Sequence, residues 1–298
     1  MALMLLIEAQ KKNEPIQLIV HGTAGTGKTH LIRAIKQTCT SVLCMAPTGM
    51  AAQLIGGVTY QSSIPVPVRN QRTWPKLPTT VLARYQEKLK DYDVLVLDEF
   101  SMLSCLANGW LDKRLREIRD PSKPYGGFKI VFSGDFGQLP PCGGMGEGGG
   151  ARENMCSVSG VCMYARVWGV NVNIRMYTGR PLFLRDIIGN ASDMAVRGSL
   201  MFNAIKEVVI LNKLQRAKNA CNEFKTCLQL VRDGKIMDDK TDPAYNILKK
   251  RFSTNVDTSK FKNATHVWYC RKPVREFNLS KLRELGTSIT IMHVLCQM

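Results

Sequence analysis

The residues best suited to chemistry form a glycine-rich loop near the N-terminus. The pattern G-x-x-x-x-G-K-[S/T] runs from Gly22 to Thr29. Glycines allow the backbone to curl so that successive N–H groups point at phosphate oxygens, and a following helix adds its positive N-terminal end. In such a loop Lys28 reaches the β- and γ-phosphates and the Thr29 hydroxyl holds Mg²⁺. The sequence therefore predicts a nucleotide-binding site made by Gly22, Thr23, Ala24, Gly25, Thr26, Gly27, Lys28 and Thr29.

Two carboxylates follow a later apolar segment. The residues Val94–Leu97 are all apolar and are followed directly by Asp98 and Glu99. Hydrolysis of a phosphoanhydride needs a metal clamp and a group that activates water. We expect Asp98 to hold Mg²⁺ through its coordination shell and Glu99 to polarise the attacking water. An acidic pair after a strand is weak evidence by itself, but it gains weight downstream of a phosphate-binding loop.

Alternating strands and helices must position these groups. An apolar run at 16–20 precedes the loop, and Leu31, Ile32 and Ile35 follow it at helical spacing, which gives the strand–loop–helix context that the pattern requires. The continuous apolar run at 94–97, and the segment 129–135 with its apolar centre at 130–132, are typical of parallel strands buried on both faces. Both runs end in polar residues, at the strand ends where open α/β sheets bind ligands. We therefore predict an α/β fold with a parallel sheet.

Composition favours a polyanionic partner. The 298 residues include 41 Lys and Arg against 24 Asp and Glu, a formal charge of +17. Lys and Arg make phosphate contacts, so this balance favours nucleic acid, although a generic basic protein remains the alternative. The 10 cysteines are scattered and form no C-x-x-C pair, which argues against a zinc ribbon or redox site and favours a reduced intracellular protein.

Other segments are less informative. The apolar N-terminus is too short to span a bilayer, and we expect it to be a helix that packs on the first domain, with no membrane segment elsewhere. Prolines predict a small irregular insertion near 62–80, and glycines predict a flexible loop at 143–150. No function is assigned to residues 151–198. Strands are expected near 207–211, opening a second α/β unit, and near 265–270.

Four motifs, in order, resemble one family. The segment Gly134–Pro141, together with Ala46–Ala52, Gly56–Thr59 and Asp98–Met102, resembles the superfamily-one DNA helicases of the Pif (petite integration frequency) type. Relatives fused into Helitron-like elements are similar too. The match covers roughly residues 16–141, and a weaker one follows over 199–285.

The resemblance implies a P-loop NTPase with two RecA-like domains, ATP between them and single-stranded DNA across their top. We expect the first domain over residues 1–198 and an incomplete second one over 199–298. The family's γ-phosphate sensor corresponds to Gln138. Its fourth-motif arginine, donated from the second domain, corresponds to Arg216, and an arginine that arrives across a cleft couples hydrolysis to domain closure.

The same resemblance suggests DNA contacts. In the family the two segments after the phosphate-binding loop line the DNA path, and the corresponding candidates here are Pro47, Thr48, Gly57 and Thr59. Ordinary turn chemistry is the alternative explanation of these residues.

The chain departs from the family pattern in several places. Gln61 stands where the family usually has His, and Ala217 where it has Gln. The upstream segment that recognises adenine in the family is missing or is cut into by the start of the chain, and nothing matches the last two helicase motifs. We therefore expect a fragment, a truncated gene model or a degenerate mobile-element copy, in which nucleotide binding survives better than coupled unwinding.

The function that these features predict is an ATP- and Mg²⁺-dependent DNA helicase. The resemblance implies that it moves 5′ to 3′ on single-stranded DNA and unwinds duplex DNA. It also implies a role in DNA repair, recombination, or telomere or genome maintenance, and a nuclear location if the organism is eukaryotic. The alternative is a catalytically impaired remnant that binds ATP and DNA. A protein remodeller is disfavoured because it would not explain the Gly134–Pro141 motif or the basic balance. A small-molecule kinase is disfavoured because Gln138 and the DNA-path segments would then have no role.

Overall fold

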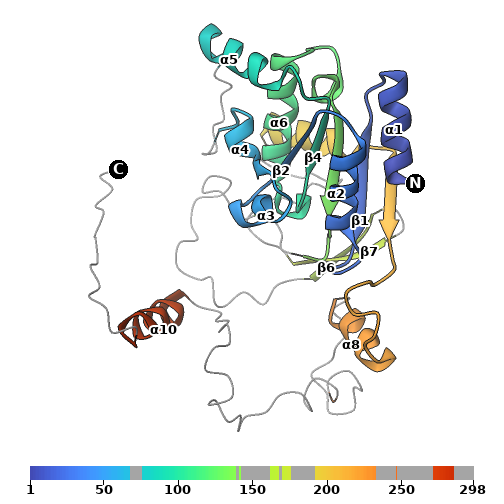
Figure 1. Cartoon of the computed structure of the whole chain (residues 1–298), viewed down its shortest axis with the longest axis vertical. Helices are drawn as coiled ribbons and strands as arrows, with labels where there is room; N and C mark the ends of the chain where they lie inside the picture. The colour runs from blue at the N-terminus through green and yellow to red at the C-terminus, as the bar shows by residue number, and fades with distance from the viewer. Residues whose placement is uncertain are drawn as a thin grey trace. The chain divides into compact units, whose positions relative to one another are not determined.

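The computed structural model describes most of the chain, in two parts (Figure 1). The described residues are 1–67, 76–138, 141, 162–167, 170–175, 192–232, 246 and 271–284. The chain divides into two compact units, Met1–Leu248 and Lys249–Met298, and each is described by itself. Part of the expected proline-rich insertion, the glycine-rich loop at 143–150 and the strand expected near 265–270 lie outside the described residues.

The first unit is built on a parallel sheet. Six strands pair in the order β3-β2-β4-β5-β1-β8, and every described pairing within this sheet is parallel. The strands are β1 (Gln17–Gly22), β2 (Val42–Ala46), β3 (Val58–Thr59), β4 (Val94–Leu97), β5 (Lys129–Gly134) and β8 (Glu207–Leu211). All residues of β4 and β5 are buried, as their apolar runs predict. The predicted α/β fold is confirmed.

Helices cover both faces of this sheet (Figure 1). The helices of the first unit whose bounds the structure describes are α1 (Ala2–Lys12), α2 (Lys28–Thr38), α3 (Gly49–Leu54), α4 (Tyr60–Ser63), α5 (Thr79–Leu89), α6 (Cys105–Ile118), α7 (Asp193–Asn203), α8 (Asn222–Arg232) and the 3₁₀ turns η1 (Phe100–Met102) and η2 (Pro124–Gly127). Thus the N-terminal segment forms the expected helix. Among the described residues, no helix has the length and apolarity needed to span a membrane.

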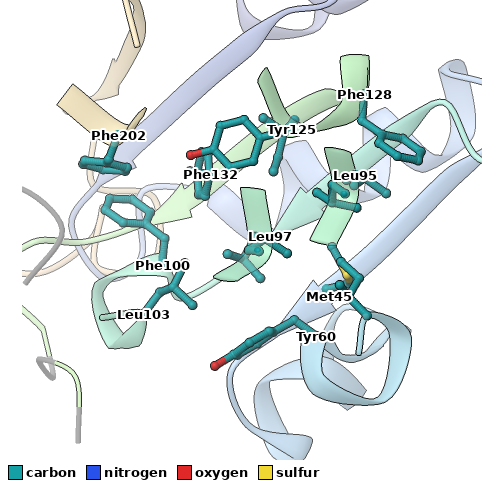
Figure 2. Close-up of a cluster of buried hydrophobic side chains, with 14 of the residues drawn as sticks. Met45, Tyr60, Leu95, Leu97, Phe100, Leu103, Tyr125, Phe128, Phe132 and Phe202 are labelled. Atoms are coloured by element: carbon teal, nitrogen blue, oxygen red, sulfur yellow. The ribbon is translucent and has the colours of Figure 1, made fainter. Parts of the chain in front are cut away.

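Two hydrophobic clusters lie on opposite faces of the sheet. Successive residues of a strand point to opposite faces: Leu95 and Leu97 belong to one cluster, whereas Val94 and Val96 belong to the other. The first cluster is rich in aromatic rings, including Phe100, Tyr125, Phe128, Phe132 and Phe202 (Figure 2). It includes side chains of α6 and α7. The second lies under α1 and α2 and includes Leu6, Ile32 and Ile35.

Helix α7 packs closely on α6. The two helices approach at glycines: a Cβ added to Gly198 would lie 2.5 Å from the amide nitrogen of Gly109. The Asn108 side chain donates to the Gly198 carbonyl at 2.7 Å, and the fully buried Asp112 pairs with Arg197 at 2.7 Å. Helix α7 is therefore fixed to the first domain along its length, across the boundary expected between residues 198 and 199.

The prediction that residues 207–211 open a second α/β unit is wrong. Strand β8 pairs in parallel with β1, with Val209 opposite Val20, and so extends the first sheet. Val209 is buried in the cluster under α1. A short apolar run shows that a strand will be buried, but it does not show which sheet the strand joins. The hairpin of β6 (Cys162–Val167) and β7 (Val170–Arg175) was not predicted, because residues 151–198 show no sustained hydrophobic period in the sequence.

The described part of the second unit is one helix, α10 (Arg271–Glu284).

Candidate nucleotide-binding site

The glycine-rich loop connects β1 to α2 at the carboxyl edge of the sheet. Gly25 and Gly27 have φ angles of 82° and 100°, in the left-handed region that glycine adopts without a side-chain clash. Between them the hydroxyl of Thr26 donates to the Thr23 carbonyl at 2.8 Å. This places the loop directly before the N-terminal end of α2, an arrangement suited to binding phosphate.

Lys28 spans the loop from the first turn of α2. Its ammonium group donates to the carbonyls of Gly22 and Thr23 at 2.7 and 3.2 Å. Burial lowers the pKa of Lys28, while the charges of Asp135, Glu99 and Asp98 oppose this shift. The amine thus lies over the loop and within the electrostatic influence of three carboxylates. Thr29, the next residue, is exposed.

The two predicted carboxylates lie at the end of β4. Asp98 is only 7% exposed, and it accepts a hydrogen bond from Ser133 Oγ at 2.8 Å, so its orientation is fixed by the neighbouring strand β5. Glu99 is half-buried and has a φ of 51°, a strained conformation for a residue other than glycine. Burial raises the pKa of Asp98. Burial and the neighbouring Asp98 raise the pKa of Glu99, which suits a group that must take up a proton.

Gln138 lies in the turn that follows β5. Its backbone N–H donates to the Asp135 carbonyl at 3.0 Å, and the Gly137 N–H donates to Asp135 Oδ1, also at 3.0 Å. Strand β5 approaches the segment after Glu99 closely, since a Cβ on Gly134 would lie 2.8 Å from the Phe100 ring. The turn is therefore held at the same edge of the sheet as the carboxylates.

Arg216 lies beside the tip of the loop. The backbone N–H groups of Gln215 and Arg216 both donate to the Gly25 carbonyl, at 2.8 and 3.0 Å. A Cβ added to Gly25 would lie 2.7 Å from the Cβ of Arg216. The structure thus brings Arg216, which follows Thr29 by 187 residues in the chain, to the phosphate-binding loop. Its side chain is exposed.

The DNA-contact candidates lie around β2 and β3, the two strands at the end of the sheet order opposite to β8. Thr48 caps α3 by accepting a hydrogen bond from the Ala51 N–H at 3.3 Å, and Thr59 pairs with Ala46 in the sheet. A Cβ on Gly57 would lie 2.8 Å from the Cys44 carbonyl carbon. Pro47, Thr48, Gly57 and Thr59 are all half-buried. Turn and packing chemistry accounts for Thr48 and Gly57 locally, and contact with DNA stays a prediction for all four.

Sequence reasoning missed three residues around this site. Asp135 and Arg232 form an ion pair at 2.6 Å, between residues 97 positions apart. His21 is 3% exposed, its ring lies 4.9 Å from that of Phe136, and within the described part of the chain its Nδ1 has no hydrogen-bond partner. Burial lowers the pKa of His21 to about 4. Asp135 and Arg232 both lie in segments that resemble the family, but nothing in the local sequence indicated that the two residues pair.

The residues at the loop suit magnesium bound with a polyphosphate. Among the described residues, no three His, Cys, Asp or Glu side chains form a cluster that could hold a metal alone. Mg²⁺ commonly takes one or two protein oxygens and completes its shell with phosphate and water. The hydroxyl of Thr29 and the carboxylate of Asp98 are donors of this kind, so the chemistry of the site fits the ion.

Sequence comparisons identify related proteins. A family model described as PIF1-like helicase matches residues 1–177. ATP-dependent DNA helicase Pif1 of Psychrobacter sp. is 33% identical over 131 residues, which are 42% of this chain and 20% of that protein. ATP-dependent DNA helicase PIF4 of Trypanosoma brucei brucei is 27% identical over 293 residues, 90% of this chain and 34% of that protein. The chain therefore spans only a minor part of the length of these relatives.

Solved structures agree on the fold. A Pif1 helicase from a study of DNA unwinding at forked double-stranded DNA has a TM-score of 0.66 and 23% identity, over 94% of this chain and 57% of that one. A Pif1 helicase from Bacteroides, in complex with ADP-AlF3 and single-stranded DNA, has a TM-score of 0.63 and 20% identity, over 97% and 57% of the two chains. Since the family model covers more than half of the sequence, the chain belongs to the PIF1-like helicase family.

Proposed function

We propose that this chain is the ATP-hydrolysing part of a DNA helicase. The observation that carries the proposal is the contact between the phosphate-binding loop and the Arg216 segment, through two backbone hydrogen bonds to Gly25. A lysine, two carboxylates and an exposed arginine then converge on one edge of the sheet. The named relatives are ATP-dependent DNA helicases, and the Bacteroides Pif1 structure contains a nucleotide analogue and single-stranded DNA, which supports the same ligands here.

In this proposal the loop residues 22–29 bind the phosphates of ATP. Lys28 leaves its carbonyl partners to contact the β- and γ-phosphates, and Thr29 and Asp98 hold Mg²⁺. The bound ion would neutralise phosphate charge. Ser133 fixes the direction of the Asp98 carboxylate by its hydrogen bond at 2.8 Å. Glu99 orients the attacking water and accepts its proton, for which its raised pKa is favourable.

Gln138 and Arg216 complete the site from opposite sides. Gln138 would contact the γ-phosphate from the turn after β5, and Arg216 would supply positive charge to the phosphoryl group in transfer. We further propose that a second RecA-like domain follows β8 and carries Arg216. Movement of that domain would then change the distance between Arg216 and the loop, which couples hydrolysis to movement along DNA.

The partner would be single-stranded DNA, with duplex DNA as the substrate for unwinding. The charge of +17 supports a polyanionic ligand. Pro47, Thr48, Gly57 and Thr59 are the proposed strand contacts, and 5′-to-3′ movement, a role in repair or recombination, and a nuclear location in a eukaryote belong to the same proposal.

Strand separation tests the proposal. A forked duplex with one labelled strand is incubated with the chain, ATP and Mg²⁺, and release of the labelled strand is followed. We expect release by the wild-type chain and none by Lys28→Ala. ATP-independent release, or none by the wild-type chain, would contradict the proposed helicase activity; binding of ATP and DNA without release would identify the impaired remnant instead.

A further inference from the structure

The Asp135–Arg232 ion pair joins two parts of the first unit near the proposed ATP site. Asp135 directly follows β5, and Arg232 is the last residue of α8. The two guanidinium nitrogens Nη1 and Nη2 donate to separate carboxylate oxygens at 2.8 and 2.6 Å. Such a bidentate pair fixes both distance and orientation. The Asp135 side chain is 2% exposed and that of Arg232 18%, so water screens the pair weakly.

Asp135 also shapes the turn that carries Gln138. Its Oδ1 accepts the Gly137 N–H, and its carbonyl accepts the Gln138 N–H, each at 3.0 Å. The guanidinium group of Arg232 lies along the same turn, since a Cβ on Gly137 would be 3.3 Å from its Nη2. The ion pair therefore acts on the backbone next to Gln138.

The segment that ends in Arg232 begins at the phosphate-binding loop. Gln215 and Arg216 bind the Gly25 carbonyl, and the chain then runs through a turn into α8. Residues 215–232 are thus attached at one end to the loop and at the other to the turn after β5. Asp135 and Arg232 also shift the pKa of Lys28 in opposite directions, which places both within electrostatic reach of that amine.

We propose that Asp135 and Arg232 are positioning residues that hold the Gln138 turn and the Arg216 segment in register for ATP hydrolysis. The inference rests on the proposed function. Neither side chain need touch the nucleotide: the pair fixes the two elements whose side chains do. Loss of the pair would leave the loop able to bind ATP, but would let Gln138 and Arg216 move relative to each other.

The test uses conservative variants of each partner. Asp135→Asn retains an oxygen for the Gly137 N–H and removes the carboxylate, whereas Arg232→Lys retains the charge and removes the fork. Asp93→Asn is the matched control, because Asp93 pairs at 2.9 Å with the buried Lys129 at the opposite end of β5. ATP turnover at saturating ATP and KM are measured for each variant and for Asp135→Asn/Arg232→Lys, together with thermal unfolding.

We expect kcat to fall about 10- to 100-fold in Asp135→Asn, as for a small misplacement of catalytic groups. KM should change less than about 2-fold, because the variant removes no group that binds ATP in the ground state. The Arg232→Lys variant should fall less, and the double variant no further than Asp135→Asn, because the pair acts as a unit. Asp93→Asn should keep the wild-type kcat.

A second measurement separates positioning from general destabilisation. ADP–aluminium fluoride resembles the state in which the γ-phosphoryl is transferred, so its affinity relative to ADP reports how well Gln138 and Arg216 are placed. We expect this ratio to fall in Asp135→Asn and Arg232→Lys but not in Asp93→Asn. An unchanged ratio, or losses that follow the folded fraction alone, would overturn the inference.

Different results would show that the positioning role is wrong and that the proposed function is wrong. If Lys28→Ala abolishes hydrolysis while the Asp135 and Arg232 variants retain wild-type kcat and ratio, only the positioning role is wrong. If hydrolysis does not depend on Lys28, the proposed function is wrong, and the positioning role falls with it.

Discussion

Replacing Gly25 by alanine separates two costs at the tip of the phosphate-binding loop. The residue has a φ of 82°, and a new Cβ would lie 2.7 Å from the Cβ of Arg216. Gly27→Ala is the matched control, because Gly27 has a φ of 100° but nothing lies within 4 Å of its new Cβ. The left-handed backbone costs about 1–2 kcal/mol in either variant. Only Gly25→Ala must also displace the Arg216 segment.

The additional loss of unfolding free energy expected for Gly25→Ala follows from the two hydrogen bonds that its carbonyl accepts. Two backbone N–H groups bind the Gly25 carbonyl, and each bond contributes about 0.5–1.5 kcal/mol net. We therefore expect Gly25→Ala to lower the free energy of unfolding by about 2–5 kcal/mol if both bonds are lost, and Gly27→Ala by about 1–2 kcal/mol.

The assay is urea unfolding without nucleotide, combined with hydrogen exchange at the amides of Gln215 and Arg216. Exchange at these amides should speed up in Gly25→Ala and stay as in the wild type in Gly27→Ala. Equal exchange in the two variants would refute the claim that the Arg216 segment rests on Gly25.

Three further outcomes are expected. Glu99→Gln should lower kcat by about 10²–10⁴-fold with ATP affinity retained. Burial raises the pKa of Glu99 in the wild type, so the acid limb of its profile of kcat against pH should lie above the ordinary glutamate pKa. Phosphate release measured across pH tests both expectations. The pKa of His21 is lowered to about 4 in the folded chain, so as the pH falls the unfolded chain takes up this proton first. The contribution of His21 to the free energy of unfolding is therefore complete above about pH 6.5 and is lost as the pH falls toward 4. Urea unfolding should show a loss of roughly 3 kcal/mol over this range in the wild type, and His21→Leu should not show it. Gly198→Ala should lower the free energy of unfolding by about 1–3 kcal/mol through overpacking against α6, whereas Gly49→Ala, with open space around its Cβ, should not lower it.

The parts of the site that could be predicted from sequence are those encoded locally. The loop at 22–29 needs glycines at defined positions, and β4 needs a continuous apolar run before Asp98, so both are visible in short windows. Parallel strands then bring the ends of β4 and β5 to one edge. This is why the acidic pair and the polar end of β5 were expected at the ligand-binding edge, whereas Gln138 was assigned through the family resemblance.

The remainder depends on contacts that no short window contains. Strand β8 joins β1 as the edge of the first sheet because Val209 packs under α1, not because of any local signal. Arg232 pairs with Asp135 across 97 positions, and a charged residue at the end of an amphipathic helix usually indicates only a solvated face. The burial of His21 arises likewise from Phe136, far along the chain.

The most direct test of the account is the rate of ATP hydrolysis with and without single-stranded DNA. A site closed by Arg216 and coupled to a DNA path predicts low turnover alone, a marked increase on addition of single-stranded DNA, and no turnover in Lys28→Ala under either condition. Equal rates with and without DNA would contradict the coupling of this ATP site to nucleic acid.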